Sequence, residues 1–221
     1  MPFSDLLQLV FVINNQDSIR DQLQKLLPPI AHDQRQLALE TYRLLADKAS
    51  PVSFHELKQS SSYTEIEIEN ILSNWPDLRL DKENNIEAFA GLSTIETSHQ
   101  IIINSKKLFT WCAWDTLFIS ALLGSRTQIK STCPVTNSSL EFEIQGYELI
   151  KQPKEQAVLS FIIPSRDFCL KNVQNQFCCH IHFFKNVEVA KQWQLDNPES
   201  LLISVEGGIE LGRMQNTIRY G

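Results

Sequence analysis

Two side chains that can do chemistry together, a thiol and a carboxyl, stand three residues apart in the segment TWCAWD. They are Cys112 and Asp115, and no other ionisable residue occurs between Leu108 and Leu123. Positions three apart on a helix are neighbours, with Cβ atoms roughly 5–6 Å apart. We therefore predict that a helix holds a nucleophile or soft metal ligand beside a proton carrier, in a poorly hydrated part of the protein.

The apolar surroundings of Asp115 bear on its protonation. Burial disfavours the charged carboxylate, so the pKa rises and the group can hold a proton near neutral pH. A carboxyl of this kind can act as a general acid or base. The alternative is a buried Asp that only accepts hydrogen bonds from the backbone or a hydroxyl, and the segment by itself leaves both interpretations open.

A second group of candidate residues lies in FCCHIHFF, residues 177–184. The composition of this run predicts a β-strand. Side chains alternate between the two faces of a strand, so Cys178 would share a face with His180 and His182, and Cys179 would point into the core. Cys178 is therefore the better candidate to share a site with Cys112.

Two other interpretations of this run remain open. Thiolate and imidazole suit zinc and copper, so Cys178, His180 and His182 could form half of a metal site. Alternatively, the histidines are hydrogen-bonded core residues and the cysteines simply pack. The spacing alone decides little, and its combination with TWCAWD is what favours a site shared by Cys112 and Cys178.

Composition narrows the class of protein. The chain has an odd number of cysteines, five, and we see no secretory signal, which together disfavour a disulfide scaffold and indicate a cytoplasmic protein. Cys133 and Cys169 are expected to be small buried residues. The longest apolar run, residues 108–124, includes Asp115 and is shorter than a membrane-spanning helix. With only seven glycines, no phosphate-binding loop is found.

The first part of the chain is expected to be helical and then to form a small hairpin. Apolar spacing and turn residues predict four helices followed by two short strands, at residues 17–27, 33–48, 53–59, 63–75, 77–81 and 85–90. A helix-turn-helix followed by a hairpin is the order of a winged helix. We expect this unit to cover residues 1–95.

A winged helix raises DNA binding as a hypothesis, and the charges argue against it. The second helix of the pair, YTEIEIENILSNW, carries Glu65, Glu67 and Glu69 and no Lys or Arg. Residues 1–100 hold eight basic against fifteen acidic side chains, whereas the remainder is nearly neutral. Affinity for DNA comes largely from cationic contacts to phosphate, so we expect a packing module and no nucleic-acid partner.

The second part, residues 96–221, is expected to mix strands and helices. A strand at residues 99–104 leads into the apolar helix with Cys112 and Asp115. Further strands are predicted at residues 127–132, 139–144, 158–163 and 177–184, then a helix at 188–195 and a strand-helix pair from 201. The fold class is therefore α+β, with a helical winged-helix-like domain packed on a mixed domain of antiparallel strands.

The runs TWCAWDTLFISALLG and FCCHIHFF, with STCPVTNSSLEFEI between them, closely resemble the bacterial organomercurial lyase (alkylmercury lyase) family. The N-terminal region, the segment GLSTIETSH and the overall length also fit. The resemblance implies that residues 96–221 form the catalytic domain. It implies an enzyme that cleaves the carbon–mercury bond by protonolysis, giving a hydrocarbon and Hg(II) in mercury detoxification.

By the same resemblance, Cys112, Asp115 and Cys178 are the catalytic set. Cys112 and Cys178 would bind the mercury, with Asp115 as a candidate third ligand. Cys133 would be structural and Cys179 non-catalytic, a residue that we leave in the core. The family implies no cofactor, low-molecular-weight thiols as acceptors of the product and a mercuric reductase as its destination.

Some positions depart from the family pattern. Trp114 replaces a smaller apolar residue and could change which organic groups fit, Ile119-Ser120 replaces Phe-Pro, and Asn137 stands where glycine is usual. Two competing functions are kept open. One is a non-catalytic protein of the same fold that binds mercury, copper or zinc. The other is a DNA-binding regulator with a metal-sensing half, against which the acidic second helix argues.

Overall fold

The computed structural model describes residues 16–163 and 173–221 of the chain. The helices, including two short 3-10 helices, are α2 (Gln16–Leu26), η1 (His32–Gln34), α3 (Arg35–Lys48), α4 (Phe54–Gln59), α5 (Glu65–Ser73), α6 (Asp115–Leu123), α7 (Val173–Gln176), η3 (Cys178–His180), α8 (Val187–Gln194) and α9 (Val205–Tyr220). Within these two ranges, no helix is both long and apolar enough to cross a membrane.

Two antiparallel sheets accompany the helices. The larger has eight strands in the order β1-β2-β3-β5-β4-β6-β7-β8 and the smaller has the order β10-β9-β11. The strands are β1 (Leu78–Leu80), β2 (Ile86–Phe89), β3 (Leu92–Ser93), β4 (His99–Ile103), β5 (Lys106–Thr110), β6 (Arg126–Thr132), β7 (Ser139–Gln145), β8 (Glu148–Lys151), β9 (Val158–Phe161), β10 (Phe183–Phe184) and β11 (Leu201–Ser204). Helices and antiparallel strands together make an α+β fold, as expected.

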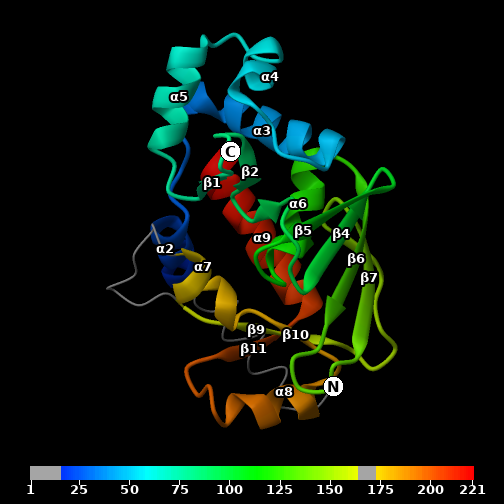
Figure 1. Ribbon diagram of the computed structural model, residues 1–221. Helices are drawn as coiled ribbons and strands as arrows, with labels where there is room; N and C mark the ends of the chain where they lie inside the picture. Colours follow the sequence, from blue (N-terminus) through cyan, green and yellow to red (C-terminus); the bar gives the residue numbers. More distant parts are fainter. Residues whose placement is uncertain (1–15, 164–172) are drawn as a thin grey trace.

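Helix α9 forms the centre of the molecule (Figure 1). It packs against α6, α2 and strands β9 and β11, while α6 also contacts α3 and the strands β4, β6 and β7 of the larger sheet. In β6 and β7 buried and exposed residues alternate, because one face of these strands covers the core. Helix α6 is buried along most of its length, as its apolar sequence requires.

The helices of the first part begin at sequence-encoded caps. Ser53 with Glu56 and Thr64 with Glu67 form capping boxes at the starts of α4 and α5. The hairpin β1–β2 follows α5 and continues through β3 into the larger sheet, so this sheet runs across residue 95. The division of the chain at that residue stays a prediction.

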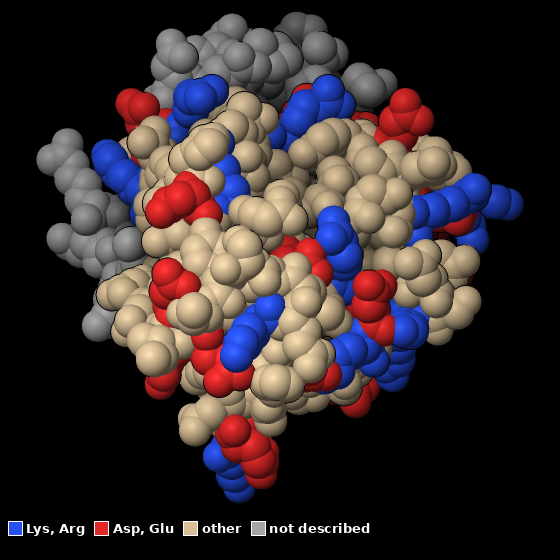
Figure 2. Space-filling view, turned by 90° about the horizontal axis from the view of Figure 1, so that it is seen from above, with Lys and Arg blue, Asp and Glu red and all other residues tan. Residues whose placement is uncertain are grey.

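The surface at the end of the molecule that carries α4 and α5 is mixed in charge. Figure 2 shows acidic and basic side chains interspersed among uncharged ones on the described part of this face. The first turn of α5 carries Glu65 and Glu67.

Two predicted elements near the candidate residues are wrong. The run 177–184 is not one strand, because its first part is the 3-10 helix η3 and only Phe183–Phe184 pair as β10. The helix predicted to include Cys112 begins at Asp115, and the strand β5, which sequence patterns did not reveal, precedes it.

Candidate active site

Cys112 lies in the tight turn between β5 and α6. The thiol is therefore not on the helix, and its closeness to Asp115 comes from the turn. The Cys112 backbone N–H donates to Oδ2 of Asp115 at 3.0 Å, and Thr110 Oγ1 donates to the Cys112 carbonyl at 2.9 Å. The first bond fixes the cysteine backbone relative to Asp115, the first residue of α6, and the second ties it to the last residue of β5.

Cys178 comes to the same place from a segment that is distant in the sequence. It opens η3, and the Ile181 N–H closes this turn by donating to the Cys178 carbonyl at 3.1 Å. The Ala113 N–H donates to the Ile181 carbonyl at 3.3 Å, which joins the Cys112 turn to the Cys178 turn. The 3-10 turn, rather than a strand, thus directs Cys178 toward Cys112.

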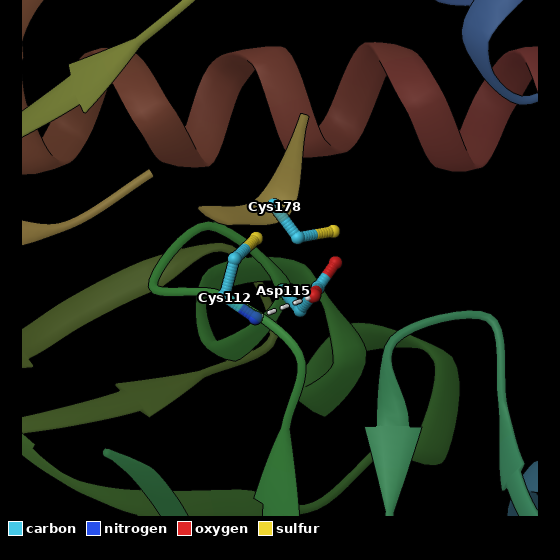
Figure 3. A group of neighbouring side chains, drawn as sticks. All are labelled: Cys112, Asp115 and Cys178. Carbon is cyan, nitrogen blue, oxygen red and sulfur yellow. Dashed lines mark hydrogen bonds between the residues drawn. The ribbon is translucent and has the colours of Figure 1, made fainter. Parts of the chain in front are cut away.

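The structure brings together all three residues singled out for catalysis. One ligand atom from each of Cys112, Asp115 and Cys178 lies within 4.8 Å of the others, and all three residues are buried. Figure 3 shows the three side chains gathered in one place, with the hydrogen bond from the Cys112 N–H to the Asp115 carboxyl dashed. Among the described residues this is the group of thiols, imidazoles and carboxyls that meets the geometry of a metal site, and it does not include His180 or His182.

Burial raises the pKa of Asp115 to about 7. Hydrogen bonds with the Cys112 side chain and backbone oppose this effect, and the negative charge of Asp77 adds to it. At neutral pH the carboxyl therefore exists in both the protonated and the ionised form, which suits a group that must both take up and release a proton.

The two thiols are held largely protonated in the absence of a ligand. Burial raises the pKa of Cys112 well above its ordinary value. A hydrogen bond from Cys112 lowers the pKa of Cys178, but burial and the neighbouring charges of Asp115 and Cys179 outweigh it, so the net shift is upward. A cation that binds both sulfurs must therefore displace their protons.

The other cysteines lie outside this group. Cys179 is exposed and its Sγ contacts the Asn175 carbonyl at 2.9 Å, so placing it in the core was wrong. Cys133 is buried; burial raises its pKa, but hydrogen bonds from Thr136 and from backbone N–H groups outweigh this and lower it overall. Cys169 lies outside the described residues.

Trp114, which directly precedes Asp115, is fully buried. Its ring meets the rings of Phe118, Phe161 and Phe177 at centroid distances of 5.0, 5.2 and 5.8 Å. Its Nε1 donates to the Gly208 carbonyl of α9 at 2.9 Å. Whether this Trp also sets the choice of organic group stays a prediction.

Gly91 lies against the site, and sequence patterns did not single it out. A Cβ at this position would stand 2.6 Å from both Cγ and Oδ1 of Asp115, and its φ is +94°. The signal available in the sequence was a lone glycine directly after a predicted strand, which often marks a close backbone approach.

Two thiols and one protonatable carboxyl in a buried site can bind a metal ion and transfer a proton. Sulfur ligands are soft and prefer soft cations to hard ones. The carboxyl can exchange a proton with whatever is bound to the sulfurs. The arrangement thus combines binding of a soft metal ion with acid–base chemistry at the bound group.

Comparison with known proteins agrees with this chemistry. A sequence model of a family described as alkylmercury lyase matches residues 92–216. The alkylmercury lyase of Staphylococcus epidermidis is 29% identical over 171 residues, which are 77% of either chain. That of Bacillus cereus is 30% identical over 154 residues, which cover 70% of this chain and 68% of the relative.

A solved structure shares the fold. The crystal structure of the mercury-bound form of MerB2 superposes with a TM-score of 0.71 at 22% sequence identity. The superposition covers 91% of this chain and 97% of that one.

Proposed function

Since the chain belongs to the alkylmercury lyase family, we propose that it cleaves the carbon–mercury bond of organomercurials by protonolysis, giving a hydrocarbon and Hg(II) in mercury detoxification. The observation that carries this proposal is the buried group of Cys112, Asp115 and Cys178, whose ligand atoms lie within 4.8 Å of one another. These residues supply what the reaction requires: the two thiols are soft ligands for mercury, and the carboxyl provides one proton for carbon.

The substrate binds through sulfur. An organomercurial R–Hg⁺ arrives as a complex with a small thiolate. The first protein cysteine replaces this thiolate, and its proton leaves with the small thiol. The second cysteine then passes its proton to the Asp115 carboxylate, and its thiolate binds the same mercury. Mercury now has three partners: Cys112, Cys178 and the carbon of R.

Cleavage of the carbon–mercury bond follows from this three-coordinate arrangement. Two thiolates increase the electron density on mercury and on its carbon, which makes that carbon easier to protonate. Asp115 delivers its proton to the carbon, the electron pair of the carbon–mercury bond goes to the new carbon–hydrogen bond, and R–H leaves. Asp115 is again a carboxylate, and Hg(II) remains on the two thiolates. One carboxyl thus acts first as base and then as acid.

The proposal also covers the cofactor requirement, the cellular location and the removal of the Hg(II) product. We propose that the enzyme needs no cofactor and works in the cytoplasm. Low-molecular-weight thiols would take Hg(II) from Cys112 and Cys178, because thiolate exchange at mercury needs a competing soft ligand. A mercuric reductase is the proposed destination of the released ion.

The organisation of the chain belongs to the same proposal. Residues 96–221 would form the catalytic domain, since they contain Cys112, Asp115 and Cys178. Residues 1–95 would form a winged-helix-like unit in which α4, α5 and the β1–β2 hairpin serve packing rather than DNA binding. The acidic first turn of α5 supports packing rather than DNA binding, because Glu65 and Glu67 would repel phosphate.

The direct test is release of hydrocarbon from methylmercury or phenylmercury in the presence of excess thiol. Wild-type protein should release methane or benzene, and the Cys112→Ser variant should not. If wild-type protein released no more hydrocarbon than the variant, the proposed activity would be excluded.

The alternative function is a protein of the same fold that only binds mercury, copper or zinc, and membership of the family does not favour it. Substitution of Asp115 distinguishes the two functions, because a protein that only binds metal needs no proton donor. The Asp115→Asn variant should still bind Hg(II) through both thiols, while hydrocarbon release falls by about 10²- to 10⁴-fold, the usual contribution of a general acid. Equal turnover in the variant and the wild type would contradict the role of Asp115 as proton donor.

A further inference from the structure

The turn formed by Ala90 and Gly91 connects β2 to β3 and lies against the Asp115 carboxyl. Both residues have a positive φ, +43° at Ala90 and +94° at Gly91. A Cβ on Gly91 would lie 2.6 Å from Cγ and Oδ1 of Asp115 and 3.0 Å from Oδ2. These distances are shorter than real Cβ contacts, so the Asp115 carboxyl can lie where it does only because residue 91 has no side chain.

The same turn is tied to the segment that carries the first thiol. The Trp111 N–H donates to the Gly91 carbonyl at 2.9 Å, next to the β3–β5 pairing of Leu92 with Thr110. Asp115 in turn accepts the Cys112 N–H. The turn, the segment that carries Cys112 and the Asp115 carboxyl are therefore linked, and a displacement of the turn would disturb the packing that holds the carboxyl in place.

Ala90 needs help to keep its conformation. A positive φ is unfavourable for a residue with a Cβ and persists where neighbouring structure holds it. Here the Tyr42 hydroxyl donates to the Ala90 carbonyl at 2.7 Å, and the Ala90 N–H donates to the Asp77 carbonyl at 2.9 Å. Tyr42 is only 1% exposed, so water does not compete for the bond.

A buried polar network supports Tyr42 from the C-terminal helix. The Tyr220 hydroxyl donates to the Tyr42 oxygen at 3.3 Å, and Arg219 Nε donates to the Tyr220 oxygen at 3.1 Å. Arg219 also pairs with Asp77 at 2.5 Å. The hydroxyl that holds Ala90 is thus itself fixed by α9, far in sequence from both Ala90 and Asp115.

We propose that Tyr42 is a positioning residue for the proton transfer: its hydroxyl holds the Ala90–Gly91 turn against Asp115 and so aims the carboxyl at the metal-bound carbon. This inference rests on the proposed function. Tyr42 lies on α3, a helix that contributes no reacting group, so the inference assigns this helix a role in the reaction. Reactions of this kind are sensitive to placement, since a shift of about 1 Å in a reacting group can slow them about 10²-fold.

The first experiment compares Tyr42→Phe with Tyr63→Phe. The second substitution is the matched control, because the Tyr63 hydroxyl also donates to a backbone carbonyl, that of Asp33, but does not touch the Ala90–Gly91 turn. Two quantities are measured on each protein: binding of Hg(II), from the absorption of the mercury–thiolate complex, and the rate of methane release from methylmercury in a single turnover.

We expect the substitution of Tyr42 to slow methane release without changing the binding of Hg(II). Tyr42→Phe should bind one equivalent of Hg(II) like the wild type but release methane about tenfold more slowly, a smaller effect than complete misplacement of the acid. Tyr63→Phe should match the wild type in both measurements. A purely structural role of Tyr42 would lower binding and release together, through loss of folded protein, and that outcome overturns the inference.

The second experiment compares Gly91→Ala with Gly146→Ala. Both glycines have a positive φ, but a Cβ on Gly146 meets nothing within 4 Å, so this control carries the backbone strain without the clash. Gly91→Ala should release methane about 10²-fold more slowly while still binding Hg(II). Gly146→Ala should behave like the wild type. If Gly91→Ala did not fold, the tyrosine pair would still decide the question.

Failure of this inference is distinguishable from failure of the proposed function. If the wild type releases methane and Tyr42→Phe is equally fast, Tyr42 has no positioning role and the lyase activity stands. If the wild type itself releases no methane, the proposed activity and this inference fall together. Crystal structures of the two tyrosine variants add a direct reading, since only Tyr42→Phe should shift the Asp115 carboxyl.

Discussion

The ring of Trp114 meets the ring of Phe177 edge to face, with centroids 5.8 Å apart. Trp114 directly precedes Asp115, and Phe177 directly precedes Cys178. Both aromatic side chains are buried. Hydrophobic packing of these neighbours, together with the bond from Ala113 to Ile181, therefore holds together two segments that are distant in sequence.

We expect Phe177→Leu to weaken mercury binding as well as stability. Loss of ring contacts should lower the free energy of unfolding by about 1–3 kcal/mol, as is typical of core substitutions. Because Cys178 is the next residue, the gap between its sulfur and that of Cys112 should also change. Denaturant unfolding and competition with a dithiol chelator for Hg(II) measure the two effects.

Phe142→Leu is the matched control for this prediction. Phe142 is also buried and packs against Phe183, with ring centroids 4.5 Å apart. It should lose similar stability while the competition with the chelator stays as in the wild type. An equal effect of both substitutions on mercury binding would show that Phe177 has no special part in placing Cys178.

The pair of Asp77 and Arg219 is expected to be important for stability. The two side chains are 2.5 Å apart and only 0% and 4% exposed. Removing one partner of a buried pair leaves an uncompensated charge, so Asp77→Ala should cost about 3–5 kcal/mol in the free energy of unfolding. Denaturant unfolding at neutral pH gives this value.

An exposed ion pair provides the comparison. Lys130 and Glu141 are 3.6 Å apart and both about half exposed. Glu141→Gln should change the free energy of unfolding by no more than about 1 kcal/mol, because solvent screens such pairs. A cost for Asp77→Ala as small as that for Glu141→Gln would contradict the importance of the buried pair.

Regular elements with clear periodicity could be predicted from the sequence. The alternation in β6 and β7 and the helical spacing in α3 gave the element types and nearly the correct bounds. Strand β5 was missed because the turn before it, Asn104-Ser105, lacks glycine. Both residues nevertheless have the positive φ that a type I′ hairpin turn requires.

The run 177–184 shows where local patterns fail. Its Phe and Ile residues favour a strand, yet tertiary contacts impose the 3-10 turn. Ser160 of β9 donates to the His180 carbonyl and accepts the His182 N–H, and Ala113 binds Ile181. Such contacts between distant segments override β propensity and cannot be read from the run itself.

The candidate site was only partly accessible to sequence reasoning. The spacing in TWCAWD placed Cys112 beside Asp115, although through a turn instead of a helix. Strand alternation selected Cys178 over Cys179 for the wrong reason, and the family resemblance was needed to join it to Cys112. Gly91 and Tyr42 escaped notice because their contacts with the site depend on the folded backbone.

Cys179 should be the most reactive of the described cysteines toward alkylating agents, because Cys112, Cys133 and Cys178 are buried and Cys179 is exposed. Partial desolvation of its sulfur raises the pKa of Cys179, so the reaction is best run at mildly alkaline pH, where more thiolate is present. Brief treatment with iodoacetamide followed by peptide mass spectrometry should find the label on Cys179 first. All four should react in denaturant.

The Cys179→Ser variant completes this test. Its sulfur is absent from the group formed by Cys112, Asp115 and Cys178, so the variant should release hydrocarbon at the wild-type rate. Slower release by Cys179→Ser, or faster alkylation of Cys178 than of Cys179 in the folded protein, would contradict the arrangement of the two neighbouring thiols.

The raised pKa of Asp115 predicts how stability depends on pH. Burial moves this pKa from 3.8 to about 7, so between these values the folded protein holds a proton that the unfolded chain has lost. The contribution of Asp115 to the free energy of unfolding is complete below the pKa of the unfolded chain. It decreases as the pH rises above that value and is lost once the pH has risen through the folded pKa of about 7. Between pH about 5 and about 8 the loss should be about 3 kcal/mol. Asp115→Asn does not titrate, so denaturant unfolding should show the wild type losing this amount relative to the variant. Parallel stability curves for the two proteins would mean that Asp115 is not a buried acid with a raised pKa.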